Sequence, residues 1–368
     1  MEDPIIGETG VLNCTNCGAE LKYKPGTKHL VCDYCGTVNE IPEMDEVIQE
    51  LDYLEYIQGK ANQEEVIQIT AITCKSCGAT SSIDPNVKSH FCPYCSTPFV
   101  IEDCHAESLI RPKSLLPFRL NPSEAKRVFT KWIQRSFWSP GKLKKAVLNF
   151  EHFKGVYLPH WTYDSRAFSS YVGQRGDYYY VTEMRTVVEN GRQVQRPQQV
   201  RRTRWRMVQG RVNNRFDDVL ICSSESVPSQ FVKKLEPWDL KNLVPFDDQY
   251  LRGFITEKYQ IELKEGFTLA KKIMDLHIRT SVARDIGGDE QRIAQVQTRH
   301  DDVTFKHILL PAYISAYRFK DKVYRFLINA RTGEVTGERP ISQLKVAVAI
   351  SLGLVIVFLL YYFGSHQK

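Results

Sequence analysis

The sequence predicts an α+β fold with two small cysteine-rich units, one mainly antiparallel α+β domain and a C-terminal apolar helix. Three observations support this. A pattern of four cysteines occurs twice, strand-like and helix-like segments alternate without a repeating βαβ unit, and a long uncharged segment lies near the C-terminus. The chain has 368 residues, enough for more than one domain. The expected boundaries are 1–37 and 71–105 for the cysteine-rich units, 38–70 for a linker, 106–340 for the α+β domain and 346–363 for the apolar helix.

Each cysteine-rich unit carries two C-x-x-C pairs with fourteen residues between the pairs. The first unit reads CTNCGAELKYKPGTKHLVCDYCGT, and the second reads CKSCGATSSIDPNVKSHFCPYCST. Each C-x-x-C makes a tight turn that directs two thiolates to one point, and a strand-turn-strand segment brings the second turn opposite the first. Four thiolates then surround zinc at about 2.3 Å each. We therefore predict two zinc ribbons, each with one structural Zn²⁺, whose ligands are Cys14, Cys17, Cys32 and Cys35 in the first and Cys74, Cys77, Cys92 and Cys95 in the second.

A redox role is the alternative for these cysteines. A thioredoxin-like site needs one C-x-x-C beside a βαβ pattern, which the sequence does not show. Four thiolates also complete the coordination of zinc and leave no position for a catalytic water, so the metal is expected to be structural. Gly18, Gly36 and Gly78 follow the second cysteine of three turns, where a positive φ is easiest for glycine.

The linker, residues 38–70, is predicted to be an acidic helix. Within EMDEVIQELDYLEYIQ the apolar residues recur at helical spacing, at Met44, Val47, Ile48, Leu51 and Leu54. The opposite face is acidic, which is typical of a helix side that faces solvent.

The α+β domain begins with a well-signalled helix in NPSEAKRVFTKWIQRSF, where Asn121 can cap the first turn and Pro122 fits inside it. From Gly155 the chain is rich in aromatic and β-branched residues, and the dipeptide at 190 and 191, Asn-Gly, predicts a hairpin turn. A helical pattern follows between Pro228 and Ala283, and strands return after it. This order favours a mainly antiparallel sheet.

A basic run within this domain suggests an acidic partner. Between Arg185 and Arg215 there are nine arginines and one acidic residue, Glu189, although the net charge of the whole chain is only +6. Arginines can neutralise phosphates, and a tryptophan can stack on a base, so nucleic acid and lipid headgroups are both candidate partners. The alternative is a strand with charged side chains on its outer face. The candidate contact residues are Arg201, Arg202, Arg204, Trp205 and Arg206.

The C-terminal segment VAVAISLGLVIVFLLYYF, residues 346–363, is uncharged and would span about 27 Å as a helix at about 1.5 Å per residue. We therefore predict a transmembrane helix that binds the lipid bilayer. Arg331, Arg339 and Lys345 precede it, and the positive-inside rule then leaves the N-terminal domains in the cytoplasm. The expected location is a single pass through the cell inner membrane.

The chain resembles a family of bacterial twin zinc-ribbon proteins that are anchored at the C-terminus and often labelled primosomal protein N-prime (replication factor Y) or helicase-like. The resemblance rests on the paired ribbons and on the blocks LLPFRLNPSEAKRVFTKW, GVYLPHWTYD, LEPWDLKNLVPFDDQYLRGFITEKY and LLPAYISAYRFKDKVYRFLINARTGEVTGERP, and it covers nearly the whole chain. It implies two zinc ribbons, a cytoplasmic domain, membrane attachment and no established activity. Some relatives look associated with membrane-stress proteins of the phage-shock type.

The sequence does not indicate an enzyme. A helicase motor needs G-x-x-x-x-G-K-[ST], and neither Gly59-Lys60 nor Gly141-Lys142 has the upstream glycine or the following hydroxyl residue. Neither His160 beside Trp161 and Asp164 nor Asp285 with Asp289 forms a recognised catalytic pattern, and no small-molecule substrate is indicated. The predicted function is a membrane-anchored adaptor that binds a protein partner, with a nucleic-acid-binding zinc-ribbon protein without a motor as the alternative.

Overall fold

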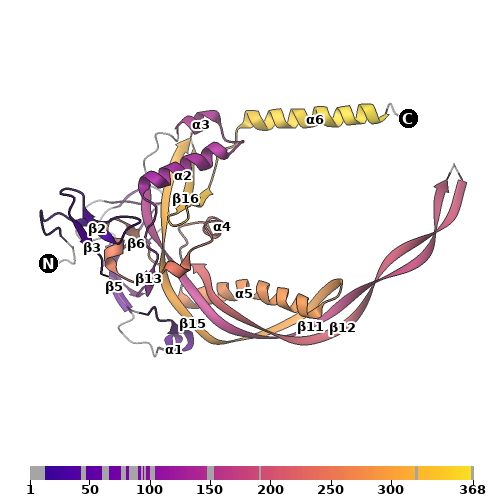
Figure 1. Cartoon of the computed structure of the whole chain (residues 1–368), viewed down its shortest axis with the longest axis horizontal. Helices are drawn as coiled ribbons and strands as arrows, with labels where there is room; N and C mark the ends of the chain where they lie inside the picture. Colours follow the sequence, from indigo (N-terminus) through magenta and orange to yellow (C-terminus); the bar gives the residue numbers. More distant parts are fainter. Residues whose placement is uncertain are drawn as a thin grey trace.

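A long curled sheet forms the centre of the computed structural model, with helices packed on it and two elements, the β11–β12 hairpin and α6, extending away from it (Figure 1). The structure describes residues 13–42, 47–59, 66–75, 80–82, 90–92, 94, 97–99, 104–146, 153–189, 192–319 and 322–365.

The strands are β1 (Leu21–Tyr23), β2 (His29–Cys32), β3 (Val38–Glu40), β4 (Leu51–Asp52), β5 (Val66–Thr73), β6 (Thr80–Ser82), β7 (His90–Phe91), β8 (Pro98–Phe99), β9 (Cys104–Ile110), β10 (Ser114–Leu115), β11 (Lys154–Glu189), β12 (Arg192–Cys222), β13 (Val244–Pro245), β14 (Ile255–Thr256), β15 (Glu290–Phe319), β16 (Lys322–Asn329) and β17 (Val335–Gly337). The helices are α1 (Tyr53–Ile57), α2 (Pro122–Arg135), α3 (Gly141–Ala146), α4 (Ser229–Lys233), α5 (Leu263–Ile286) and α6 (Gln343–Ser365), with short 3-10 turns η4 (Leu240–Asn242) and η5 (Asp248–Leu251).

The main sheet has nine strands, with the central order β12-β11-β15-β10-β13. Its pairs are antiparallel except for β10 with β15 and β11 with β14. Three smaller sheets, β1-β2-β3, β6-β5-β9 and β7-β8, belong to the N-terminal cysteine-rich region. The long strands β11, β12 and β15 therefore determine the shape of the domain.

The three long strands bend together at one level. The register between β11 and β12 shifts between Tyr163 and Ser165, and the register between β11 and β15 shifts between Asp164 and Arg166. At these shifts Asp218 of β12 has φ 50° and Asp302 of β15 has φ 49°, a conformation that aspartate tolerates better than most residues. Because a bulge bends and twists its strand, two bulges flanking β11 account for a bend of the whole sheet.

Three clusters of buried apolar side chains join the other elements to the sheet. The first packs α2 and the first cysteine-rich unit near Tyr157, and the second packs α4 and the second unit near Val156 and Leu158. Because successive side chains of a strand point to opposite faces, these two clusters lie on opposite sides of the sheet. The third cluster packs α5 against β11, β12 and β15. The sheet curls around this helix (Figure 1).

The contact between α5 and the sheet is close because α5 has a glycine where it meets β11. The hydroxyl of Tyr163 donates to the carbonyl of Leu263 at 2.7 Å, and the indole of Trp161 donates to the carbonyl of Ile261 at 2.8 Å. A Cβ atom at Gly266 would lie 2.4 Å from the Tyr163 hydroxyl and 2.9 Å from the Trp161 ring. Gly266 is therefore required by packing and not by backbone conformation.

We predict that Gly266→Ala lowers the free energy of unfolding by about 1–3 kcal/mol, although alanine favours a helix over glycine by about 1 kcal/mol. Denaturant unfolding of the purified protein measures this difference. Thr268→Ala, at an exposed position of the same helix, is the control and should change stability by less than about 0.5 kcal/mol. A stabilised Gly266→Ala variant would contradict the close packing.

The helix at the start of the α+β domain is confirmed. The Asn121 side chain accepts from the Glu124 N–H at 2.9 Å, and the Glu124 carboxylate accepts from the Asn121 N–H at 2.9 Å, so α2 begins with a complete capping box. Ala125, Phe129 and Ile133 form its buried face.

The predicted helix of the acidic linker is wrong for the described part of residues 38–70. Val38–Glu40 is β3, Leu51–Asp52 is β4, and only Tyr53–Ile57 is helical. The apolar spacing failed as a signal because β4 pairs with β15 and because Glu50 accepts hydrogen bonds from Thr304 and Lys306. Residues 43–46, which include Met44, lie outside the described residues.

The predicted transmembrane helix is also corrected. Residues 346–363 do lie in a helix, α6, but no helix in the described part of the chain is long and apolar enough to cross a membrane. A spanning helix needs about 20 apolar residues in succession, and within the described residues α6 does not provide such a run. The expected single pass through the inner membrane is therefore not supported by the described residues.

Candidate metal centre and projecting arm

Four cysteine thiols converge at the first cysteine-rich unit. The Sγ atoms of Cys14, Cys17, Cys32 and Cys35 all lie within 4.8 Å of one another, with 3.5 Å between Cys14 and Cys35 and 3.5 Å between Cys17 and Cys32. A tetrahedron with metal–sulfur bonds of about 2.3 Å has edges of about 3.8 Å, so the arrangement fits a metal ion. These four cysteines can therefore hold one metal ion.

The two turns that present these thiols have the same backbone hydrogen bonds. The N–H of Gly18 donates to the Cys14 carbonyl at 2.8 Å, and the N–H of Gly36 donates to the Cys32 carbonyl at 3.0 Å. Both glycines have φ 72°, as predicted from their place after the second cysteine. The local sequence therefore determines the turn, and the hairpin brings the two turns together.

The thiols of this unit differ in their pKa values. The Thr37 hydroxyl, 3.0 Å from the Cys35 sulfur, lowers the pKa of Cys35 to about 5. The backbone N–H of Ala19 favours the Cys17 thiolate, but the neighbouring sulfurs of Cys35 and Cys32 outweigh it and raise the pKa of Cys17 to about 12. Four adjacent thiolates repel one another, so a divalent cation at their centre is what would allow all four to be deprotonated.

The first unit is not an independent module, because it packs into the core of the domain. The Tyr23 hydroxyl donates to the Phe118 carbonyl at 3.2 Å, and the N–H of Gly26 donates to the same carbonyl at 2.8 Å. A Cβ atom at Gly26 would lie 2.9 Å from the Arg119 carbonyl oxygen. Cys14 and Cys32 themselves belong to the core cluster that includes Phe118. Loss of the metal centre would therefore disturb the α+β domain as well.

The second unit is described only in part. Cys74 and Cys92 are buried in the second core cluster, and the N–H of Cys92 donates to the Thr97 carbonyl at 2.9 Å, just as that of Cys32 donates to Thr37 at 2.9 Å. Cys77 and Cys95 lie outside the described residues. The second zinc site therefore stays a prediction.

A buried carboxyl group joins the second unit to the domain. Glu257 is 2% exposed, and its carboxyl accepts hydrogen bonds from the hydroxyls of Tyr94, Ser224 and Ser226. Burial raises the pKa of Glu257 to about 7, although these hydroxyls favour the charged form. The group therefore changes its charge close to neutral pH.

We predict that the wild-type protein loses stability relative to Glu257→Gln as the pH rises. A raised pKa in the folded state means that this group contributes its stability below its unfolded pKa of about 4.5 and loses it as the pH passes about 7. The full loss is about 3 kcal/mol, of which about 2 kcal/mol falls between pH 5.5 and pH 8.5. Denaturant unfolding of both proteins at about pH 5.5 and pH 8.5 measures it. Glu262→Gln, an exposed residue, is the control, and a difference between wild type and Glu257→Gln that stays constant with pH would contradict the prediction.

A two-stranded arm is formed by the distal parts of β11 and β12. β15 begins at Glu290, opposite Gly176, and beyond this point β11 has no second partner among the described strands. β11 and β12 continue as a pair from Asp177 opposite Arg204 to Glu189 opposite Arg192, as the hairpin prediction at 190–191 requires. We call residues 177–189 and 192–204 the arm. Figure 1 shows it extending beyond α5 and away from the rest of the sheet.

The loop after α5 fixes the base of the arm. The N–H of Asp289 donates to the Gly176 carbonyl at 2.9 Å, and the Asp289 carboxylate accepts from the Tyr178 N–H at 2.6 Å. The Tyr178 hydroxyl donates to Glu290 at 2.8 Å. Asp289 therefore has a structural role at this position.

The basic run predicted from the sequence lies along the arm and just below it. Arg201, Arg202, Arg204 and Arg206 are all exposed. The Arg201 guanidinium lies 4.1 Å from the Tyr178 ring centre and that of Arg204 5.1 Å from the Tyr179 ring centre, while Arg202 pairs with Glu183 and Arg206 with Asp177. Each of these arginines therefore already has a partner in the chain.

Trp205 lies on the opposite face of β12 from Arg204 and Arg206, and it is half-buried. The Arg292 guanidinium lies 3.9 Å from its ring centre, and a Cβ atom at Gly176 would lie 3.0 Å from the ring. The ring thus contacts the base of the arm, where Gly176 provides the space.

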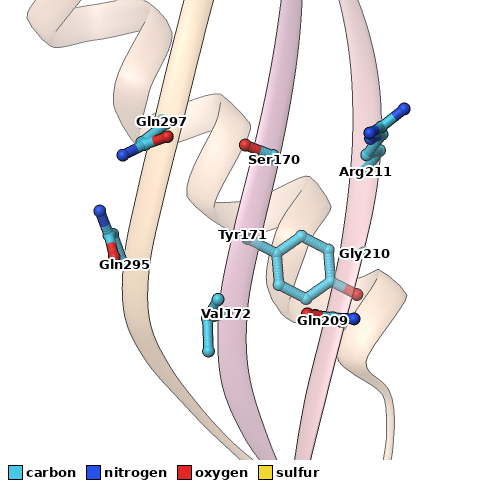
Figure 2. A pocket seen from close by; sticks show the side chains of 8 residues that line it. All are labelled: Ser170, Tyr171, Val172, Gln209, Gly210, Arg211, Gln295 and Gln297. Carbon is cyan, nitrogen blue, oxygen red and sulfur yellow. The ribbon is translucent and has the colours of Figure 1, made fainter.

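Below the arm, the face of the sheet opposite α5 is open. Figure 2 shows three neighbouring strands with Gln295 and Gln297 on β15, Ser170 on β11, and Gln209 and Arg211 on β12, and with α5 behind them. These side chains line a shallow depression of about 500 Å³. The Tyr171 side chain instead reaches α5, where its hydroxyl donates to Asp285 at 2.6 Å.

His160 is fully buried, and its Nδ1 atom lies 2.9 Å from the Leu158 carbonyl oxygen. Burial lowers its pKa to about 4, so it is neutral at physiological pH. Asp285 and Asp289 accept the hydrogen bonds described above. These three residues, considered as catalytic candidates from the sequence, thus have local structural partners.

The sequence interpretation missed the residues that bend the sheet. The bulges of β12 and β15 fall within RFDDV and RHDDV, which are two copies of R-x-D-D-V with the positive φ at the second aspartate of each. Around Asp164, between the two bulges, Lys306 pairs with Glu50 at 2.9 Å and with Asp218 at 2.8 Å. The repeated pentapeptide R-x-D-D-V could have indicated from the sequence where the strands bend.

Comparison with known proteins identifies no family model and no solved structure that match this chain. The chain is 25% identical over 347 residues to the uncharacterized protein YdjG of Bacillus subtilis (strain 168), and the match covers 92% of each chain. The similarity therefore extends over almost the whole molecule. It assigns no activity, and the resemblance to twin zinc-ribbon proteins stays a prediction.

Proposed function

We propose that this chain is a zinc-ribbon adaptor that binds a protein partner and that the arm is its main contact surface. The arm supplies no residue to the three core clusters. A two-stranded hairpin on its own is only marginally stable in water. An extension that adds so little to folding is best explained by a contact with another molecule.

The exposed side chains of the arm suit a protein partner. Tyr180 is 64% exposed and Met184 59% exposed, and arginines lie beside them. Tyrosine, methionine and arginine are enriched in protein–protein interfaces, where they supply contact area and directed hydrogen bonds. The arm combines all three.

Nucleic acid is the second candidate, because a two-stranded β-ribbon fits the major groove and arginines line this one. Binding of phosphates depends on cations that are free to replace counterions. Arg202 and Arg206 are paired with carboxylates, and Arg201 and Arg204 lie against tyrosine rings. These contacts favour the protein partner.

The ribbons would serve this function as a structural frame. A set of four cysteines suits Zn²⁺ and leaves no open coordination position for chemistry, and the repeated spacing supports a second zinc ion at Cys74, Cys77, Cys92 and Cys95. Because the first ribbon is packed into the core beside Phe118, its zinc would hold the sheet and hence the direction of the arm.

Metal analysis of the purified protein should find about two zinc ions per chain. Cys14→Ser with Cys17→Ser should remove one of them and also lower the stability of the α+β domain, since the first ribbon shares its core. Cys222→Ser is the matched control and should leave the zinc content unchanged. One zinc ion or none in the wild-type protein would contradict the assignment of two sites.

Shortening the arm tests the adaptor function directly. Removal of residues 180–189 and 192–201, with the Asn-Gly turn kept at 190 and 191, preserves the pair Tyr179 and Arg202. We expect the free energy of unfolding to change by less than about 1 kcal/mol, while proteins that copurify with the full chain are lost.

The matching variant for the ribbons is Cys14→Ser with Cys74→Ser, compared in the same copurification. If no protein depends on the arm or on either ribbon, the adaptor function is wrong. If a partner remains bound to the shortened chain, the arm is not its contact surface.

A further inference from the structure

The outer edge of β12 is a long unpaired strand edge. β12 is the terminal strand of the main sheet, and within the described chain it pairs only with β11. α5 packs against the face of β12, through contacts such as that of Asn214 with Ser281 at 2.8 Å. The backbone groups on the outer edge are therefore available for another strand.

This edge carries charged side chains, but it lacks the other features that usually prevent strand addition. Prolines, bulges and short length are the common protections of an edge strand. The only proline of β12 is Pro197 near the tip, and the register with β11 runs unbroken from Arg192 to Phe216, where the bulge begins. The segment Gln198–Phe216 is thus a regular, accessible template.

The charge of this segment determines which strand fits it. It contains six arginines and no acidic residue. Arg211 and Arg215 are exposed, and no acidic side chain of the described chain pairs with them, in contrast to Arg202 and Arg206. A second copy of β12 would place arginines beside arginines, which destabilises a strand pair. The complementary partner is an acidic strand.

We propose that the outer edge of β12, Gln198–Phe216, binds an extended acidic segment of a partner protein by β-strand addition. Main-chain hydrogen bonds would supply affinity, and acidic side chains at alternate positions would meet Arg211 and Arg215. This inference rests on the proposed adaptor function and names the class of segment that it recognises.

A synthetic peptide of about twelve residues with alternating valine and glutamate is the probe. We expect it to bind the full chain and to slow amide hydrogen exchange along Gln198–Phe216, whereas the matching valine–lysine peptide does not bind. Arg211→Glu with Arg215→Glu should weaken binding by about tenfold or more. The control, Lys272→Glu with Arg284→Glu on α5, makes the same change of net charge away from the edge and should bind as the wild type does.

Arg211→Gln with Arg215→Gln serves if the charge-reversed protein does not fold, and it should weaken binding to a smaller extent. The proposal is overturned if the peptide does not bind, if both peptides bind equally, or if the newly protected amides lie outside β12. It is also overturned if single-stranded DNA binds the same edge with steep salt dependence, or if the chain pairs with itself through β12. A partner found by copurification that leaves the exchange of β12 unchanged would refute strand addition but not the adaptor function.

Discussion

The rest of the structure depends on β11, which is hydrogen-bonded along both edges. Between His160 and Gly176 it pairs with β12 on one side and β15 on the other, and this three-stranded part carries α5. Because β15 stops at Glu290 while β12 continues, the sheet narrows to two strands. The unequal length of three strands thus creates the arm and leaves the edge of β12 open.

Two kinds of residue adapt this long sheet to its neighbours. The second aspartates of the two R-x-D-D-V segments take positive φ and bend the strands on both sides of β11. Gly266 lets α5 approach Trp161 and Tyr163. At the end of the sheet away from the arm, Tyr23 and Gly26 hold the first ribbon against Phe118. The group of four cysteines and the sheet are therefore parts of one folded unit.

This arrangement changes how the ribbons are understood. The sequence suggested small modules on a helical linker, whereas Cys14, Cys32, Cys74 and Cys92 are buried in core clusters on the two faces of the sheet. The cysteine-rich units at one end are part of the buried core, whereas the arm at the other end supplies no residue to it.

The sequence by itself determined features that a few neighbouring residues decide. The capping box of Asn121, the turns at Gly18 and Gly36 and the pairing of strands across residues 190–191 all follow from local backbone geometry. The failed linker helix had good local spacing, but the pairing of Leu51 with Phe305 is a contact that local patterns do not encode. The length of each long strand, the open edge of β12 and the burial of the ribbons were decided only by tertiary structure, since each depends on where a distant partner begins or ends.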